Sequence, residues 1–186
     1  MVLGISGKVA SGKSAALKIL SKHGFLVLDA DDIVHDLYKK GAKGQKLIEE
    51  NFGTEYLLDN GDVNRELLGE LVFLNQEKLI ELNELIHPLV YILIEKAIEQ
   101  AKVQNKNLAI EAIDFDEKYL GKLVDKILLI ERPPEQIMAT MIDERGCNQD
   151  IATKIISVFK MPNRVDFLIE NNGSLNDFEK ELLKSF

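Results

Sequence analysis

The sequence lacks the features of three classes of protein: the cysteines of disulfide-stabilised proteins, the long apolar runs of membrane-spanning proteins, and the low hydrophobicity of disordered chains. Its single cysteine, Cys147, cannot form an internal disulfide or a metal cluster, and intracellular proteins rarely carry disulfides. No apolar run approaches the roughly 20 residues of a membrane-spanning helix, and the first residues lack the basic start and long apolar stretch of a signal peptide. A hydrophobic fraction of 46% excludes the profile of a disordered chain. We therefore expect a cytoplasmic protein with no membrane partner.

Positive charge is also scarce. Lysine and arginine total 23 against 31 aspartates and glutamates, which gives a formal net charge of −8. Such a field repels nucleic acid and anionic membranes, so we expect no nucleic-acid partner. Any anionic ligand must therefore be captured by a local site. A length of 186 residues suits one compact core with room for a smaller appended lobe.

Short apolar runs alternate with helical patterns along much of the chain. The runs predicted as strands are 2–6, 25–28, 108–110, 126–130 and 166–169. The continuous apolar run 25–28 is interpreted as a central strand covered on both faces. Helices are predicted at 13–23, 117–123, 133–143, 149–160 and 175–183, the last opened by a capping box of Ser174 and Asp177. Five strands separated by helices predict a parallel α/β sheet with right-handed crossovers.

A long helical block separates the second predicted strand from the third. Residues 32–107 show no strand alternation and are broken at Gly41, Gly44, Gly53 and a turn at 59–62. We interpret this block as an insertion that forms a lobe of its own.

A glycine-rich octapeptide lies between the first predicted strand and the first predicted helix. Gly7-Lys-Val-Ala-Ser-Gly12-Lys13-Ser14 fits the pattern G-x-x-x-x-G-K-[ST] of the phosphate-binding P-loop. The two glycines let backbone N–H groups turn inward, and the following helix presents its positive end. We expect Lys13 to reach the β and γ phosphates of ATP and Ser14 to ligate Mg²⁺. The residues expected to bind ATP are Gly7, Ala10, Ser11, Gly12, Lys13, Ser14 and Ala15.

The alternative, a glycine-rich turn with a surface lysine, is disfavoured because both the octapeptide and its strand–helix context match.

Three acids follow the second predicted strand. Because parallel strands share an edge at their carboxyl ends, Asp29, Asp31 and Asp32 are expected near the P-loop. In an extended backbone Asp29 and Asp31 point to one side and Asp32 to the other. Phosphoryl transfer uses a carboxylate that orients the acceptor hydroxyl and takes its proton, and Asp31 is our candidate. From these residues alone, helix caps or solvated acids account for the three equally well.

These motifs together resemble the dephospho-coenzyme A kinase family. The segment 4–14 followed by Val27-Leu-Asp-Ala-Asp31 resembles the opening of that family. The segments Val63-Asn-Arg65, Val72-Phe73, His87-Pro88-Leu89 and Ile169-Glu-Asn-Asn-Gly-Ser174 follow in the family's order. The resemblance implies a P-loop NTPase with a three-layer α/β/α fold, a five-stranded parallel sheet, a helical acceptor lobe and a short lid. The implied division is core 1–32, 108–137 and 165–186, acceptor-binding lobe 33–107 and lid 138–164.

The resemblance also implies an activity and a set of site residues. The activity is transfer of the ATP γ-phosphoryl group to the 3′-hydroxyl of dephospho-coenzyme A, the last step of coenzyme A biosynthesis, with Mg²⁺ required. It makes Asp31 the general base, acting with Lys13 and Arg145, and places Arg65 and His87 with Asp31 at the acceptor. The expected partners are ATP and dephospho-coenzyme A, and the expected state is a monomer or weak oligomer.

The chain departs from the family pattern at two places. Where the family reads D-x-P-L-L-F-E, residues 111–117 keep an acid at the strand end but lose the Pro-Leu-Leu core. Glu111 fits either a water-mediated Mg²⁺ contact or a strand-end cap. In the lid, the first of two family arginines is replaced by Ala139, Arg145 matches the second, and Lys154 and Arg164 are weaker candidates.

Other interpretations stay open at this stage. Without the family, Arg65 and Arg145 read as exposed helix residues and His87 as a structural histidine. Two other functions are considered: a P-loop kinase of another small alcohol or nucleotide, and a nucleotide-dependent switch without catalysis. The absence of an N-K-x-D guanine-reading motif disfavours the switch.

Overall fold

A computed structural model describes residues 1–112, 115 and 119–185. The chain divides into two compact units. The first unit comprises Met1–Asp29 and Ile98–Phe186, and the second comprises Ala30–Ala97. The expected boundaries of core, lobe and lid stay predictions.

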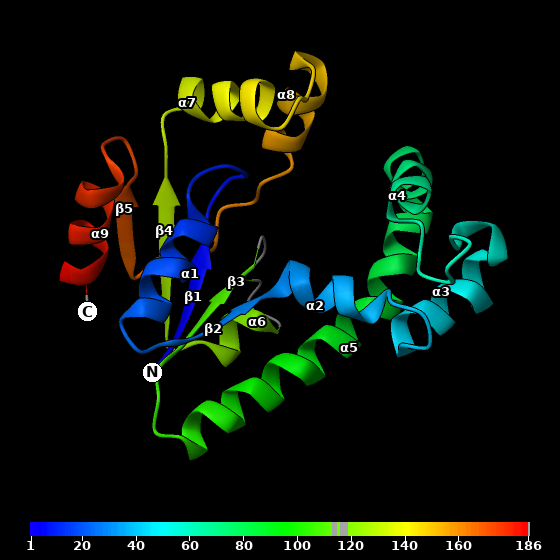
Figure 1. Cartoon of the computed structure of the whole chain (residues 1–186), viewed down its shortest axis with the longest axis horizontal. Helices are drawn as coiled ribbons and strands as arrows, with labels where there is room; N and C mark the ends of the chain where they lie inside the picture. The colour runs from blue at the N-terminus through cyan, green and yellow to red at the C-terminus, as the bar shows by residue number, and fades with distance from the viewer. Residues whose placement is uncertain (113–114, 116–118, 186) are drawn as a thin grey trace. The chain divides into compact units, whose positions relative to one another are not determined.

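The first unit is built on a parallel sheet. Within the described residues the sheet has five strands in the order β2-β3-β1-β4-β5 (Figure 1). The strands are β1 Val2–Ser6, β2 Leu26–Asp29, β3 Leu108–Glu111, β4 Lys126–Glu131 and β5 Phe167–Glu170. All neighbours pair in parallel, so every strand ends at the same edge. The prediction of five parallel strands is confirmed, with β2 and β5 each beginning one residue later than predicted.

Helices cover both faces of this sheet, which confirms the three-layer α/β/α fold. Alternate strand residues face one side and bury their side chains against α1 (Lys13–Lys22) and α9 (Leu175–Lys184). The members of this core include Leu3, Ile5, Leu128, Ile130, Leu17, Leu20, Phe178 and Leu182. On the other face Gly4 lies under Phe115, and α6 (Leu120–Leu123) lines a cavity there with Ile127. Gly4 has no Cβ, so the Phe115 ring packs directly on the strand.

The interpretation of residues 25–28 as a central strand is wrong. β2 lies at the edge of the sheet, and Val27 is 39% exposed. A short apolar run records hydrophobicity but not its place in the strand order, and here β3 pairs between β2 and β1. The central strand is β1, which carries the glycine-rich loop.

The backbone after β2 is not extended, so the condition under which Asp29 and Asp31 would point to one side is not met. Helix α2 (Ala30–Leu37) begins directly after Asp29, so Asp31 and Asp32 lie in its first turn. Carboxylates are favoured at a helix N-terminus because they face the positive end of the helix dipole. Asp29 alone of the three acids belongs to the strand.

The second unit is helical, apart from one isolated bridge between Leu57 and Val63 among its residues. Its elements are α2, α3 (Lys43–Phe52), the 3₁₀ turn η1 (Thr54–Tyr56), α4 (Arg65–Leu74) and most of α5 (Gln76–Val103), which continues into the first unit. A helix break was predicted at Gly44, but this residue lies within α3, in its first turn, so the prediction is wrong. A Cβ there would stand 2.6 Å from the Leu37 carbonyl oxygen, so this glycine lets α3 pack closely on the end of α2. Gly53, in contrast, does end α3.

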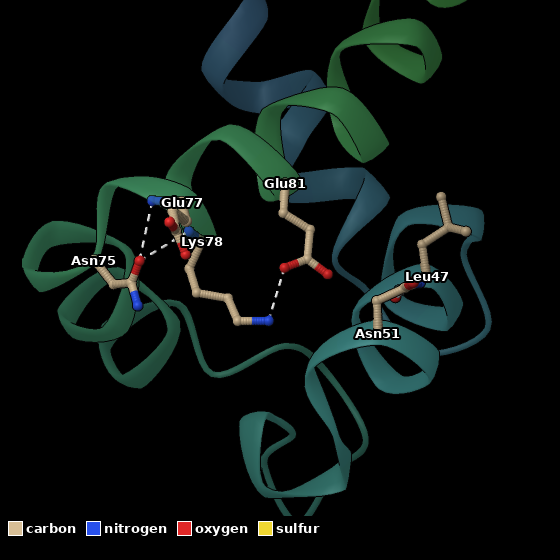
Figure 2. Close-up of polar contacts among 6 residues, drawn as sticks. All are labelled: Leu47, Asn51, Asn75, Glu77, Lys78 and Glu81. Atoms are coloured by element: carbon tan, nitrogen blue, oxygen red, sulfur yellow. Dashed lines mark hydrogen bonds and ion pairs between the residues drawn. The ribbon is translucent and has the colours of Figure 1, made fainter.

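Polar contacts fix the start of α5 (Figure 2). The side-chain oxygen of Asn75 accepts hydrogen bonds from the N–H groups of Glu77 at 3.0 Å and Lys78 at 3.2 Å, as a helix cap does. The Lys78 ammonium pairs with Glu81 at 2.7 Å. The same ammonium lies 5.3 Å from the centre of the Phe52 ring of α3. These contacts connect α5 to α3 within the second unit.

The chain after β4 forms α7 (Pro134–Ala139), a π-helical turn η2 (Thr140–Glu144) and α8 (Gln149–Ser157), and Figure 1 shows α7 beyond the carboxyl end of β4. The predicted helices at 133–143 and 149–160 are confirmed in position, the second ending earlier. The helix predicted at 117–123 is described only as α6, since 117 and 118 lie outside the described residues. The capping box of Ser174 and Asp177 is confirmed. No helix among the described residues is long and apolar enough to cross a membrane.

Asp166 joins the starts of β4 and β5, and its contacts lead us to expect that acid lowers the stability of the fold. Its carboxylate accepts from the Ile127 N–H at 2.8 Å and pairs with Lys126 and Arg164, each at 3.1 Å. Burial alone would raise the pKa of Asp166, but these hydrogen bonds and charges together hold that pKa below its ordinary value of 3.8. A depressed pKa contributes stability that is present above the unfolded-state value and lost as pH falls through the folded-state value.

Asp166→Asn is therefore expected to lower the free energy of unfolding at pH 7 and to reduce its decline below about pH 4. Urea denaturation of both proteins at pH 7 and pH 3 measures this. An equal decline in both would show that Asp166 is not a source of the acid sensitivity.

Candidate active site

The glycine-rich loop connects the central strand β1 to α1, as its pattern predicts. Gly7 and Gly12 have φ angles of +154° and +109°, in the region that favours glycine. A Cβ on Gly7 would stand 2.5 Å from the Ile130 carbonyl oxygen at the end of β4. Glycine is thus required at position 7 both by its own conformation and by the close approach of β4.

Three carbonyl groups of the loop are held by side chains. Lys13 Nζ donates to the Lys8 oxygen at 3.1 Å, Arg132 Nη1 to the Ala10 oxygen at 3.0 Å, and Asn171 Nδ2 to the Ser11 oxygen at 2.8 Å. These hydrogen bonds fix the course of the loop backbone between Lys8 and Ser11. A loop with a fixed backbone is what the binding of phosphate by main-chain N–H groups requires.

Lys13 lies beside the acidic edge of the sheet. It is only 8% exposed, and its Nζ stands 3.7 Å from Glu111 Oε1. Glu111 ends β3 in register with Asp29 of β2, so both carboxylates lie on one face of the sheet at the edge where the loop begins. The P-loop lysine thus has a buried carboxylate partner, which the sequence did not indicate.

The oxygen donors near the loop fit a magnesium ion. Ser14 is the second residue of α1 and is exposed, and Asp29 and Glu111 end the neighbouring strands. Mg²⁺ prefers oxygen ligands and is usually held by one or two protein groups together with nucleotide phosphates and water. The hydroxyl and carboxylate groups here match that chemistry.

A cavity of about 560 Å³ adjoins the loop at the carboxyl ends of β4 and β5. Its lining includes Lys8, Arg132, Pro133, Phe159, Met161 and Asn172. It combines an apolar wall with polar groups, as small-molecule sites commonly do.

Sequence reasoning missed two of the side chains that hold the loop, Arg132 and Asn171. Arg132 follows directly after β4, and Asn171 follows directly after β5. The rule that ligand sites gather at the carboxyl ends of parallel strands points to both residues, as it does to the acids after β2.

In the second unit, Arg65 is the first residue of α4 and lies beside His35, with Nη1 and Nδ1 3.5 Å apart. Both line a cavity of about 210 Å³ with Tyr38 and Lys39. Burial raises the pKa of Tyr38 to about 12, against the opposing effect of the Arg65 charge, so its hydroxyl stays protonated. His87 is exposed on α5 next to Tyr91, with 3.4 Å between Nδ1 and the hydroxyl.

Of the remaining candidate residues, Asp31 belongs to the second unit, and Arg145 and Arg164 belong to the first. Asp31 is exposed in the first turn of α2, and Arg145 is exposed just after η2. Arg164 donates to the Val124 carbonyl oxygen at 3.0 Å and pairs with Asp166, both at the amino ends of strands. The interpretation of Arg164 as a lid residue is therefore wrong, because it is fixed at the sheet edge opposite the P-loop. Part of the altered segment 111–117 lies outside the described residues.

A parallel α/β sheet whose central strand leads through a glycine-rich loop into a helix, with a buried lysine under the loop, defines a P-loop protein that binds the polyphosphate of a nucleotide. The family model for dephospho-CoA kinase matches residues 1–177, and the chain belongs to this family. It is therefore an ATP-dependent kinase of coenzyme A biosynthesis.

Individual relatives agree with this assignment. The chain is 33% identical to a dephospho-CoA kinase of Bacillus licheniformis over 187 residues, covering 98% of this chain and 93% of the relative. Among solved structures, TT1252 from Thermus thermophilus has a TM-score of 0.74 at 25% identity, covering 100% and 95% of the two chains. A dephospho-CoA kinase from Campylobacter jejuni has the same fold, with a TM-score of 0.64 at 24% identity and coverage of 98% and 94%.

Gly7→Ala is expected to destabilise the loop even without nucleotide. The unfavourable φ costs about 1–3 kcal/mol, and the contact with the Ile130 oxygen adds to it because main-chain atoms cannot move aside. Gly24→Ala is the matched control, since Gly24 has a φ of +89° but nothing within 4 Å of its Cβ position. Urea denaturation should give a clearly larger loss for Gly7→Ala. Equal losses would mean that the approach of β4 does not constrain position 7.

Proposed function

We propose that this chain transfers the γ-phosphoryl group of ATP to the 3′-hydroxyl of dephospho-coenzyme A in the cytoplasm, giving coenzyme A and ADP. The observation that carries the proposal is the loop over residues 7–14, with its carbonyl groups held by side chains and the buried Lys13 beneath it. Family membership gives the acceptor.

ATP would bind with its phosphates in the loop. The Lys13 ammonium, which donates to the Lys8 oxygen, would move a short way to reach the β and γ phosphates. The other residues around the phosphates would be Gly7, Ala10, Ser11, Gly12, Ser14 and Ala15. The cavity beside Lys8 and Pro133 is of a size that suits a nucleoside, and Phe159 and Met161 supply apolar surface for a base.

Magnesium would be held by the Ser14 hydroxyl and the nucleotide phosphates, with Glu111 or Asp29 acting through water. When bound, the ion would neutralise charge on the transferring group. Arg145, on the segment after η2, would add a second positive charge to the phosphates in the transition state.

The acceptor would be held by the second unit. Arg65 supplies positive charge at the cavity that also contains His35 and Tyr38, and this charge suits the anionic groups of dephospho-coenzyme A. His87 would add a polar contact. Asp31 would orient the 3′-hydroxyl and take its proton as the oxygen attacks the γ phosphorus.

An acceptor screen tests the proposal. Purified protein with ATP and Mg²⁺ should release ADP when dephospho-coenzyme A is added, and it should not respond to coenzyme A, in which the 3′-hydroxyl already carries phosphate. Shikimate, gluconate and nucleoside monophosphates test the rival kinase activities. Release with one of these and not with dephospho-coenzyme A would replace the acceptor, and nucleotide binding without release would favour the switch.

A further inference from the structure

The turn of the phosphate loop packs on the segment that follows β4. Ile137, Met141 and Ala152 form a buried cluster from α7, η2 and α8, and Val9 and Ala10 of the loop pack against it. The loop and this segment therefore share one apolar interface within the first unit.

Arg132 connects the same two parts by hydrogen bonds. Its Nη1 donates to the Ala10 carbonyl oxygen at 3.0 Å and to Thr140 Oγ1 at 3.1 Å, and its Nε donates to Gln136 Oε1 at 3.2 Å. Gln136 and Thr140 are spaced by four along α7 and into η2, so both side chains lie on one side of this segment, where they accept from Arg132. Because a guanidinium group is planar and rigid, two fixed nitrogens fix its whole orientation.

The bonded carbonyl belongs to the residue of the loop that most needs support. Ala10 has a φ of +58°, a left-handed conformation that a residue with a side chain adopts only when its surroundings hold it there. The Arg132 hydrogen bond and the apolar contacts of Val9 and Ala10 supply that support from one side. The loop turn is therefore shaped by residues more than 120 positions away in the chain.

We infer that Arg132 is a positioning residue that holds the turn of the phosphate loop in its binding conformation and couples it to α7 and η2. The Arg132 guanidinium does not bind the phosphate itself but keeps the loop ordered. A loop that is ordered before binding does not lose conformational entropy when phosphate binds, so its affinity is higher. The inference rests on the proposed function only in taking polyphosphate as the ligand of the loop.

The test compares the affinity of variants for ATP and for inorganic tripolyphosphate, measured by calorimetry well below the unfolding temperature. Arg132→Met should lower the affinity for both ligands by the same factor, about tenfold, which corresponds to the loss of roughly one charge-assisted hydrogen bond. Arg132→Lys should show nearly the same loss, since lysine keeps the charge but cannot hold Ala10, Gln136 and Thr140 together. Thr140→Val, which removes only one of the hydrogen bonds of Arg132, should lower the affinity for both ligands by about twofold.

Arg164→Met is the matched control. Arg164 is also an arginine that bonds a main-chain carbonyl and a side chain, but at the opposite edge of the sheet, so its loss should lower the unfolding temperature without changing either affinity. Full affinity in Arg132→Lys would show that charge alone matters, and weakening of ATP but not tripolyphosphate would show a nucleoside contact. Either result, or unchanged affinity with lower stability, would overturn the inference. Because no acceptor is present, the result does not depend on which alcohol is phosphorylated.

Discussion

Asp31→Asn is expected to lower the turnover number by about 10²- to 10⁴-fold, with ATP affinity nearly unchanged. Asparagine keeps the size and a hydrogen-bond acceptor but cannot take the proton of the attacking hydroxyl. Asp31 lies exposed in the first turn of α2, outside the phosphate loop, so its charge is not needed to hold ATP. Steady-state kinetics with dephospho-coenzyme A and calorimetric titration with ATP measure the two quantities separately.

Asp32→Asn is the control for this experiment. Asp32 is the next residue, is also exposed and lies in the same helical turn, so its removal changes the same helix-end electrostatics. We expect a change within about twofold, as for surface substitutions away from a site. Similar losses in both variants would assign the effect to the charge of the helix start, and an unchanged Asp31→Asn would remove Asp31 as the base.

Lys13→Met should lower kcat/KM for ATP by about 10² to 10³-fold or more and weaken ATP binding. The ammonium group is the buried positive charge of the loop, and methionine preserves the length of the side chain without the charge. Lys18→Met, at an exposed position of the same helix, should leave the kinetics unchanged.

Lys13→Met should also lower the free energy of unfolding, because it leaves the buried Glu111 carboxylate without the Lys13 ammonium that stands 3.7 Å away. Lys13→Met with Glu111→Gln removes both charges and should recover much of the lost stability while activity stays low. Recovery of activity along with stability would mean that Lys13 acts only as a structural partner of Glu111.

The phosphate loop could be predicted from the sequence because much of what defines it is local. The octapeptide, the strand before it and the helix after it lie within about 20 residues, and the two glycines and Lys13 have roles that follow from their chemistry. The strands could be predicted equally well, since each is a short apolar run whether it lies inside the sheet, as β1 does, or at its edge, as β2 does. The capping box before α9 likewise needs only four consecutive residues.

What the sequence could not provide depends on contacts between distant residues. The edge position of β2 follows from the pairing of β3 on both β2 and β1, which an apolar run does not encode. The bonds of Arg132 to Ala10 and of Asn171 to Ser11 span 122 and 160 positions. The start of α2 at Ala30 was not predicted, because the predicted helical block begins at Asp32 and acids at this point fit a strand end as well as a helix N-terminus.

Phosphorus nuclear magnetic resonance of the reaction product is the most direct test of the assigned activity. Protein, Mg²⁺ and ATP incubated with dephospho-coenzyme A should give one new phosphomonoester signal, coupled to the 3′ proton of the ribose, in equal amount to the ADP formed. A phosphomonoester at any other hydroxyl, or ADP formed with free phosphate and no such ester, would contradict the account.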